Sequence, residues 1–252
     1  MPSLEASQTI VLGLGWSEIL VVSLATAAGV LVQGTIGFGF GLLAAPVLVA
    51  VDPVFVPGPI LVVALGQTLA AALREPTEIA TGDIAPVLLG RIPGTIVGAC
   101  MIVMLPGSGL VVSVGVLVIL AVIMSVIGLR PPRSSGSLRI AGFLSGFMST
   151  VSSVGGPPLA LVYQHENGSR LRGTLAAHFV LGCSLSLLVL ALAGRLGSAE
   201  IKAAIVLTPS VAIGFALSYP AIRWMKPSWG RPAVLGLSAL AGGIVVVREL
   251  FF

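Results

Sequence analysis

Two interruptions in otherwise apolar sequence govern how this chain can fold: VQGTIGFGFG at residues 32–41 and STVSSVGGPP at residues 149–158. Glycine gives the backbone maximal freedom, whereas proline removes a hydrogen-bond donor and clashes with the preceding helical turn. Both stretches therefore predict a break in a helix. Within a membrane, unwound backbone is tolerated only where protein or a water-filled cavity surrounds it. We therefore expect protein or a cavity around both breaks.

The composition indicates a membrane protein. Of the 252 residues, 13 are Lys or Arg and 9 are Asp or Glu, so that only 9% are charged, whereas soluble domains have about 25%. The hydrophobic share is 56% and the mean hydropathy is +1.11. This excludes a soluble enzyme, a disordered tail and a nucleic-acid-binding module, because too few polar side chains exist to cover a globule. A nucleic-acid partner is not expected despite a pI near 9.7, since the basic residues form short clusters and no basic face. We predict a polytopic all-α protein in a lipid bilayer.

Eight apolar runs are candidates for membrane spans, which need about 20 residues each. The first run has 33 residues and, like the fifth, contains one of the breaks. Each of these two runs is predicted to form a hairpin of two short helices that enters and leaves on one side. Residues 1–17 contain no Lys or Arg, so we expect no cleaved signal peptide. The eight runs are Ile19–Val51, Val54–Leu73, Ile84–Leu105, Leu110–Leu129, Ile140–Tyr163, Thr174–Gly194, Ile201–Ile222 and Pro232–Val247.

A shift of 116 positions brings the two halves of the sequence into register, because Gly39 and Gly155 are 116 positions apart. A single ungapped shift that aligns both breaks predicts two repeats, residues 16–130 and 135–250, joined by a polar cytoplasmic linker at residues 131–139. With one hairpin and three spans in each repeat, the number of crossings is odd, so the repeats are predicted to be inverted. The same shift also aligns Gly66 with Gly182, Pro93 with Pro209 and Gly98 with Gly214.

The basic residues support this topology. With two hairpins, nine basic residues fall on one face and three on the other, which is the bias expected between cytoplasmic and external loops. If Ile140–Tyr163 were one straight span, the split would be seven against five. We therefore predict that both chain termini lie outside. The nine cytoplasmic residues are Arg74, Arg130, Arg133, Arg139, Arg170, Arg172, Arg223, Lys226 and Arg231, and the three external ones are Arg195, Lys202 and Arg248.

Both breaks carry groups that suit a small anion. Inverted repeats with discontinuous helices are typical of secondary transporters, which hold their substrate near the midplane at the repeat interface. The N–H groups at the start of a helix carry partial positive charge, and hydroxyls, an amide and glycines surround both breaks. The alternative is that these small residues only let helices approach closely. On the first interpretation, the substrate-binding residues at the breaks are Gln33, Gly37, Phe38, Gly39, Ser152, Ser153, Gly155 and Gly156.

Three residues within other spans extend this candidate site. Arg91 lies about 10 Å inside its span, and no Asp or Glu within a span is available to pair with it. Its guanidinium is therefore predicted either to contact an anion or to reach up to the lipid headgroups. Gln67 is included because Cys183, its partner under the 116-residue shift, would face it across the repeat axis. His178 can titrate near neutral pH and is a candidate for proton coupling, although a lone histidine near a helix end is more often structural.

The residues around the breaks resemble those of a known family. Residues 32–41, followed by Pro46, resemble the first half-motif of the TauE/SafE family of sulfite exporters, and Gly142–Gly146 through to Pro158 resembles the second. The resemblance covers nearly the whole chain. It implies a multi-pass carrier of the bacterial inner membrane that transports sulfite or small organosulfonates without a cofactor.

The leading hypothesis is a secondary transporter that exports a small sulfur-containing anion, driven by protons or by the membrane potential. A passive anion channel is an alternative within transport. An intramembrane hydrolase that pairs Ser152 or Ser153 with His178 is an alternative from another class. The sequence contains no nucleophile motif in usable context, so we predict that the chain is not an enzyme.

The two cysteines, Cys100 and Cys183, lie in apolar runs. A disulfide framework and a cysteine-based metal site are therefore not expected, and no metal is predicted. A thiol relay through the two cysteines is a further alternative. The identity of the anion, the direction of transport and the oligomeric state stay open, with a homodimer as one option.

Overall fold

The computed structural model describes residues 12–105, 107–166, 168–224 and 227–251. These residues form helices and no strand, which confirms the predicted all-α class. Six of the described helical segments are long and apolar enough to cross a membrane. The α-helices are α1 (Trp16–Ile36), α2 (Phe40–Val51), α3 (Gly58–Arg74), α4 (Ile84–Met104), α5 (Gly107–Val126), α6 (Ser135–Ser152), α7 (Gly156–Val162), α8 (Gly168–Leu192), α9 (Ser198–Trp224) and α10 (Pro227–Phe251). Short 3₁₀ turns are η1 (Pro53–Phe55), η2 (Pro76–Glu78) and η3 (Thr81–Asp83).

The first break separates α1 from α2. Gly37 has a φ of +102° and Gly39 a φ of +123°, which glycine adopts without the penalty that a Cβ would bring. The N–H of Gly37 donates to the carbonyl of Gln33 at 2.7 Å and so caps α1. The two arms are unequal, since α1 has 21 residues and a length of about 31 Å, whereas α2 has 12 residues. The prediction of two short helices is wrong here, because α1 begins at Trp16 and reaches the length of a span before the break.

The second break, between α6 and α7, is shorter than predicted. Helix α6 ends at Ser152, Ser153 has a left-handed backbone with a φ of +61°, and α7 begins at Gly156. The proline pair at residues 157–158 therefore stands in the first turn of α7. Proline is tolerated there because the first N–H groups of a helix have no intrahelical partner. The expectation that this pair unwinds a helix is wrong, because it begins one.

The linker between the predicted repeats is also shorter than residues 131–139. Helix α6 begins at Ser135, because the hydroxyl of Ser134 accepts the N–H of Ser137 at 3.2 Å and so caps the first turn.

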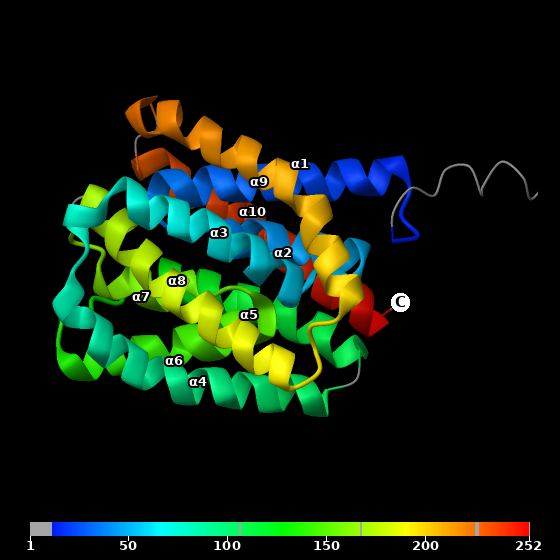
Figure 1. Ribbon diagram of the computed structural model, residues 1–252, viewed down its shortest axis with the longest axis horizontal. Coiled ribbons are helices and arrows are strands. Elements are labelled where there is room, and N and C mark those ends of the chain that lie inside the picture. Colours follow the sequence, from blue (N-terminus) through cyan, green and yellow to red (C-terminus); the bar gives the residue numbers. More distant parts are fainter. Residues whose placement is uncertain (1–11, 106, 167, 225–226, 252) are drawn as a thin grey trace, which may run out of the picture.

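The two hairpins enter the bundle from opposite ends and meet at their tips (Figure 1). The α1–α2 hairpin opens toward the end where α10 finishes, and α6–α7 opens toward the end where α5 finishes. At the tips, a Cβ on Gly41 would overlap the backbone carbonyl of Ser153, and one on Gly156 would lie 2.8 Å from the Cβ of Phe38. The contacts between helices keep the same pattern when α1–α5 of the first half are exchanged with α6–α10 of the second. Helix α4 packs on α6 as α9 packs on α1, and the equivalent helices α3 and α8, and α5 and α10, pack on each other. Inverted repeats would produce these contacts, and the inversion itself stays a prediction.

Close packing of α4 on α6 draws the middle of α4 into the protein. Glycines lie on both sides of this contact, Gly90 and Gly94 on α4 and Gly142 and Gly146 on α6. A Cβ at any of the four would collide with the backbone of the other helix. Small residues allow the same close approach in other pairs of membrane helices. Arg91, which follows the first of these glycines, is consequently enclosed by the bundle.

The basic residues separate between the two ends of the bundle. The last turns of α3, α5 and α9 and the first turns of α4, α6 and α8 gather at one end (Figure 1), which we call the cationic end. Lys226 and the side chain of Arg231 lie outside the described part of the chain. Seven of the nine residues predicted to share a face belong to the helix ends and connections of the cationic end: Arg74, Arg130, Arg133, Arg139, Arg170, Arg172 and Arg223. Arg195, Lys202 and Arg248 belong to the opposite end.

Candidate functional site

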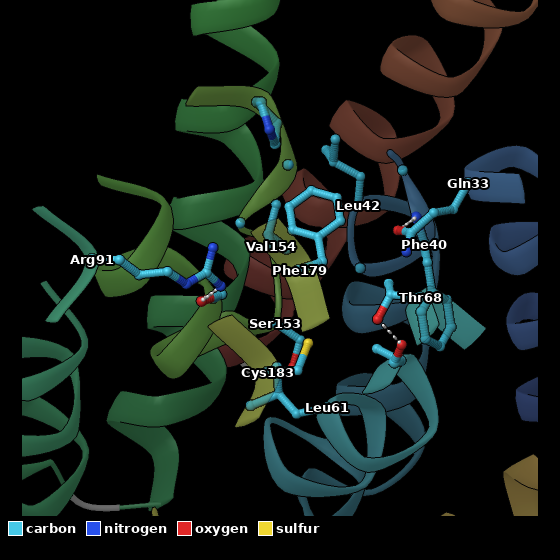
Figure 2. Close-up of a pocket in the computed structure, with 17 residues that line it drawn as sticks. Gln33, Phe40, Leu42, Leu61, Thr68, Arg91, Ser153, Val154, Phe179 and Cys183 are labelled. Atoms are coloured by element: carbon cyan, nitrogen blue, oxygen red, sulfur yellow. Dashed lines mark hydrogen bonds between the residues drawn. The ribbon is translucent and has the colours of Figure 1, made fainter. Parts of the chain in front are cut away.

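A small cavity lies in the centre of the bundle, where the two hairpin tips meet. Its volume is about 40 Å³, enough for a few water molecules. Figure 2 shows Arg91 entering from one side and Gln33 and Thr68 on the other, with Val154 and Phe179 between them. The cavity is lined by Gln33, Gly39, Phe40, Gly41, Leu42, Leu61, Ala64, Thr68, Arg91, Ser149, Ser153, Val154, Gly155, Gly156, Pro157, Phe179 and Cys183.

Arg91 is the one charged side chain among these lining residues. It is 1% exposed, and its Nη1 and Nη2 donate to the hydroxyls of Ser145 at 2.9 Å and Ser149 at 3.1 Å. Its Nε is buried and has no hydrogen-bond partner. A guanidinium in the middle of a membrane costs about 2.5–3.5 kcal/mol on insertion scales, so it is expected to face a cavity or a partner. Because the side chain is enclosed, the structure favours the cavity over the lipid headgroups.

Helix α8 makes room for this guanidinium at Gly182. A Cβ at that position would overlap the guanidinium carbon of Arg91, so any other residue would displace the arginine. Gly66, its counterpart under the 116-residue shift, has no atom within 4 Å of the position of a Cβ. Of these two equivalent positions, only Gly182 must be glycine to leave room for a neighbouring side chain.

A pair of glutamines lies on the opposite side: Gln33 lines the cavity, and Gln67 borders a smaller void beside it. The N–H of Phe40 donates to Oε1 of Gln33 at 3.2 Å, and Nε2 of Gln33 donates to Oε1 of Gln67 at 2.7 Å. Since only oxygen can accept from the Phe40 N–H, this chain fixes the orientation of both amides. Nε2 of Gln67 is left as a buried donor without a partner. Buried polar atoms are nearly always paired, so this donor is a place where a water or a ligand can bind.

The start of α2 adds backbone donors. The first N–H groups of a helix have no intrahelical partner and carry partial positive charge. Of these groups, the N–H of Phe40 is taken by Gln33, whereas Gly41 and Leu42 both line the cavity. The second break offers less than expected, because the first turn of α7 contains two prolines, which lack N–H groups. The structure thus favours the first break as the source of backbone donors.

Eight of the predicted site residues lie at the cavity or beside it. Gly37 and Gln67 border a smaller void that also touches Arg74 and Arg172 of the cationic end. That these residues bind a substrate stays a prediction. The six that line the cavity itself are Gln33, Gly39, Arg91, Ser153, Gly155 and Gly156.

Phe38 and Ser152 do not line the cavity. Phe38 is buried and packs against Gly156, where it holds the two tips together. The hydroxyl of Ser152 donates to the carbonyl of Met148 at 2.8 Å, within its own helix.

His178 also lies outside the lining residues. Its Nε2 is 3.0 Å from the hydroxyl of Tyr163. Of the two serines in the hydrolase hypothesis, Ser153 lines the cavity, and its hydroxyl donates to the carbonyl of Pro57 at 3.1 Å. The serine–histidine pair that the hydrolase hypothesis needs is therefore not formed.

The described residues offer no support for metal or thiol chemistry. Among them, no group of three His, Cys, Asp or Glu side chains could hold a metal ion. Both thiols are free; Cys183 is buried at the cavity, whereas Cys100 is exposed on α4.

Sequence reasoning overlooked how Arg91 is held. Ser145 and Ser149 are four residues apart and share one face of α6, as do the glycines of that helix that contact α4. The spacing of glycines by four residues on both α4 and α6 is typical of helices that pack closely, so it could have indicated that these two helices contact each other. Pairing them would have placed the two serines beside Arg91.

The wall of the cavity therefore presents donors and one positive charge, and no carboxylate among its described residues. Such a site can bind an anion and would repel a cation.

Comparison with known proteins agrees with this chemistry. Residues 21–245 match the model of a protein family described as sulfite exporter TauE/SafE. The match includes both breaks and every residue that lines the cavity. Searches of curated proteins and of solved structures find no match.

Proposed function

The chain belongs to the sulfite exporter TauE/SafE family, a family of membrane transporters and not of enzymes, and from this premise we propose that it is a secondary transporter exporting a small sulfur-containing anion. The family resemblance of the two breaks is thereby confirmed. In the proposal, sulfite or a small organosulfonate binds in the central cavity, held by Arg91, Gln33 and the start of α2.

Buried donors without acceptors carry this proposal. Nε of Arg91 is buried and unpaired at the central cavity, and Nε2 of Gln67 is a second buried, unpaired donor at the smaller void beside it. Leaving such groups unpaired costs about 1–3 kcal/mol each. A sulfite or sulfonate group offers several oxygens that accept hydrogen bonds, and the guanidinium presents a planar fork of donors that suits them.

We place the cationic end in the cytoplasm, because basic residues are enriched in cytoplasmic loops. Both described ends of the chain then lie on the outside, since α1 begins and α10 ends at the opposite end of the bundle. The membrane is the bacterial inner membrane, as the family implies.

Export requires that the cavity opens to one side at a time. At the cationic end, Arg172 of α8 forms an ion pair with Glu75, which follows α3. The two side chains are 13% and 12% exposed, and Arg172 borders the void next to the cavity. We propose that separation of α3 from α8 breaks this pair and admits the anion from the cytoplasm.

Efflux from proteoliposomes tests this function. Vesicles with the purified protein would be loaded in turn with sulfite, sulfate, thiosulfate, sulfoacetate or taurine. We expect saturable efflux of at least one of them. Arg91→Lys keeps the charge but loses the fork, so it should weaken the apparent affinity roughly ten- to a hundredfold, or about 1.5–3 kcal/mol. Arg130→Lys, at an exposed position of the cationic end, is the matched control and should behave as wild type.

Three outcomes would count against the proposal. Efflux that rises linearly with concentration would indicate a channel. No efflux of any of the five compounds would contradict the transport function. An unchanged affinity in Arg91→Lys would remove the arginine from the site.

A further inference from the structure

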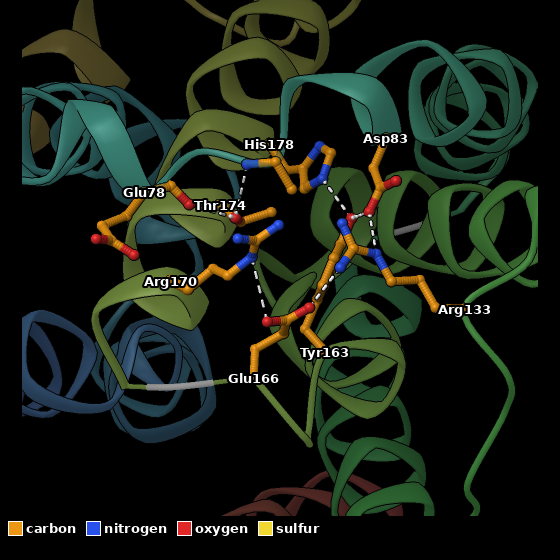
Figure 3. Close-up of polar contacts among 9 residues, drawn as sticks. Glu78, Asp83, Arg133, Tyr163, Glu166, Arg170, Thr174 and His178 are labelled. Atoms are coloured by element: carbon orange, nitrogen blue, oxygen red, sulfur yellow. Dashed lines mark hydrogen bonds and ion pairs between the residues drawn. The ribbon is translucent and has the colours of Figure 1, made fainter.

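A chain of hydrogen bonds leads from the surface of the cationic end to a buried imidazole. Tyr163, which follows α7, donates its hydroxyl proton to Oδ2 of Asp83 at 2.9 Å, and the same hydroxyl lies 3.0 Å from Nε2 of His178 on α8. Figure 3 shows the three side chains in this order, with Arg133 against Asp83. The Asp83 side chain is 15% exposed, whereas Tyr163 and His178 are 1% and 2% exposed. The chain therefore connects water to His178.

Fixed charges hold the outer part of this chain. Arg133 contacts Asp83 at 2.7 Å and forms an ion pair with Glu166, which also meets Arg170 at 3.2 Å. The Arg133 guanidinium lies over the ring of Tyr163, 5.4 Å from its centroid. The hydrogen bond with Asp83 raises the pKa of Arg133, so its charge persists throughout the range in which histidine titrates. Asp83 and Tyr163 thus stay aligned when a proton moves between them.

The inner end of the chain lies beside the arginine of the cavity. His178 precedes Gly182 by four residues and therefore shares its face of α8, and the guanidinium of Arg91 fills the space at Gly182. A proton on His178 would thus meet a positive charge about one helical turn away. The charged and titratable groups around His178 are Arg91 from α4, Asp83 from η3, Tyr163 after α7, Arg133 before α6 and Cys183 on α8 itself.

We infer that Asp83, Tyr163 and His178 form a proton route to the Arg91 wall, and that a proton on His178 and the transported anion bind together. The inference rests on the proposed function, since it assigns a proton to the anion that is carried. An anion beside Arg91 offsets the repulsion between the guanidinium and a protonated His178. A proton on His178 in turn adds attraction for the anion, because the coupling between two binding sites is reciprocal.

The proton transfer is balanced along the chain. While Asp83 is ionised, the Tyr163 hydroxyl donates to it. When water delivers a proton to Asp83, the carboxylic acid donates to the Tyr163 oxygen, and Tyr163 passes its own proton to Nε2 of His178. Neutral His178 must carry its proton on Nδ1 for this step, because Nε2 is the accepting atom. One proton leaves Asp83, one arrives on His178, and Tyr163 ends unchanged.

Proteoliposomes with a pH-sensitive dye test the route. Sulfoacetate and thiosulfate suit this test because both stay ionised between about pH 6 and pH 8, where histidine titrates; any proton that moves with them is carried by the protein. In wild type, we expect anion efflux to move protons in the same direction. The apparent affinity for the anion should weaken by up to about tenfold per unit rise in pH if one proton binds with each anion.

Two variants distinguish the loss of proton transfer from the loss of anion binding. Tyr163→Phe keeps the ring and removes the hydroxyl, so proton flux should fall to the level of protein-free vesicles while the anion still binds. Tyr219→Phe, at the other tyrosine of the chain and 51% exposed on α9, is the matched control and should transport protons as wild type does. His178→Gln should bind the anion with an affinity that no longer depends on pH.

The outcomes distinguish this inference from the proposed function. Anion efflux without proton movement in wild type would overturn the inference and leave the export function standing, whereas no efflux at all would overturn the function itself. Wild-type proton flux in Tyr163→Phe would exclude the route. If thermal unfolding shows that Tyr163→Phe does not fold, His178→Gln decides, and an unchanged pH dependence there would overturn the inference.

Discussion

Replacing Gly182 by alanine should displace the Arg91 guanidinium while the backbone of α8 tolerates the change. In a helix, alanine is about 0.8–1 kcal/mol more favourable than glycine. The added Cβ, however, would coincide with the guanidinium carbon of Arg91. The arginine must then leave the hydroxyls of Ser145 and Ser149, which accept its hydrogen bonds at 2.9 and 3.1 Å.

The expected cost follows from these two bonds. Hydrogen bonds to charged groups contribute about 1.5–3 kcal/mol each, so losing both lowers the free energy of unfolding by about 3–6 kcal/mol. The helical gain offsets about 1 kcal/mol of this. An anion that depends on the guanidinium loses at least one such contact, which corresponds to a roughly ten- to more than hundredfold weaker affinity.

Calorimetric titration of the purified protein with sulfite measures this effect, with Gly66→Ala as the matched control. Gly66 is the counterpart of Gly182 in the first half of the chain, and its Cβ position is open. Gly66→Ala should bind sulfite as wild type does and unfold at a slightly higher temperature. Wild-type affinity in a folded Gly182→Ala protein would show that the guanidinium does not hold the anion.

Three further changes probe other parts of the site. Gly39→Val places a branched side chain at a φ of +123° in the first break, so it should abolish efflux, while fractionation shows normal insertion; retained efflux would refute the role of this break. Gln33→Leu leaves the N–H of Phe40 and Oε1 of Gln67 without their hydrogen-bond partner. The free energy of unfolding should therefore fall by about 1–3 kcal/mol per unpaired group, and an unchanged unfolding midpoint would contradict this prediction. Glu75→Gln weakens the ion pair with Arg172, so a water-soluble maleimide added at the cationic end should label Cys183 in the cavity faster; an equal labelling rate would argue against a gate at this pair.

The breaks in the helices were predictable because backbone conformation there depends on local chemistry. Gly37 and Gly39 have positive φ angles that other residues adopt with strain, and the 116-residue shift pointed to the second break. The exact limits were not predictable in the same way. The proline pair at residues 157–158 could end one helix or begin the next, and only the position of Ser153, which turns the chain, decides between these.

The side-chain partners depended on packing between distant segments. Arg91 could be singled out from the sequence because a charged side chain within an apolar span is costly unless it faces a cavity or a partner. Its burial against Ser145 follows from the contact between α4 and α6, which lies outside any local pattern. The link from His178 through Tyr163 to Asp83 joins residues up to 95 positions apart, so sequence spacing alone did not reveal it.

An anomalous diffraction map of crystals soaked in selenite tests the central claim most directly. Selenite has the charge and shape of sulfite, and selenium marks its own position in the map. A selenium peak between the hairpin tips, within hydrogen-bonding distance of Arg91 and the start of α2, is the predicted result, and the peak should disappear in Gly182→Ala. A peak confined to the exposed arginines of the cationic end, with the central cavity empty, would contradict the account.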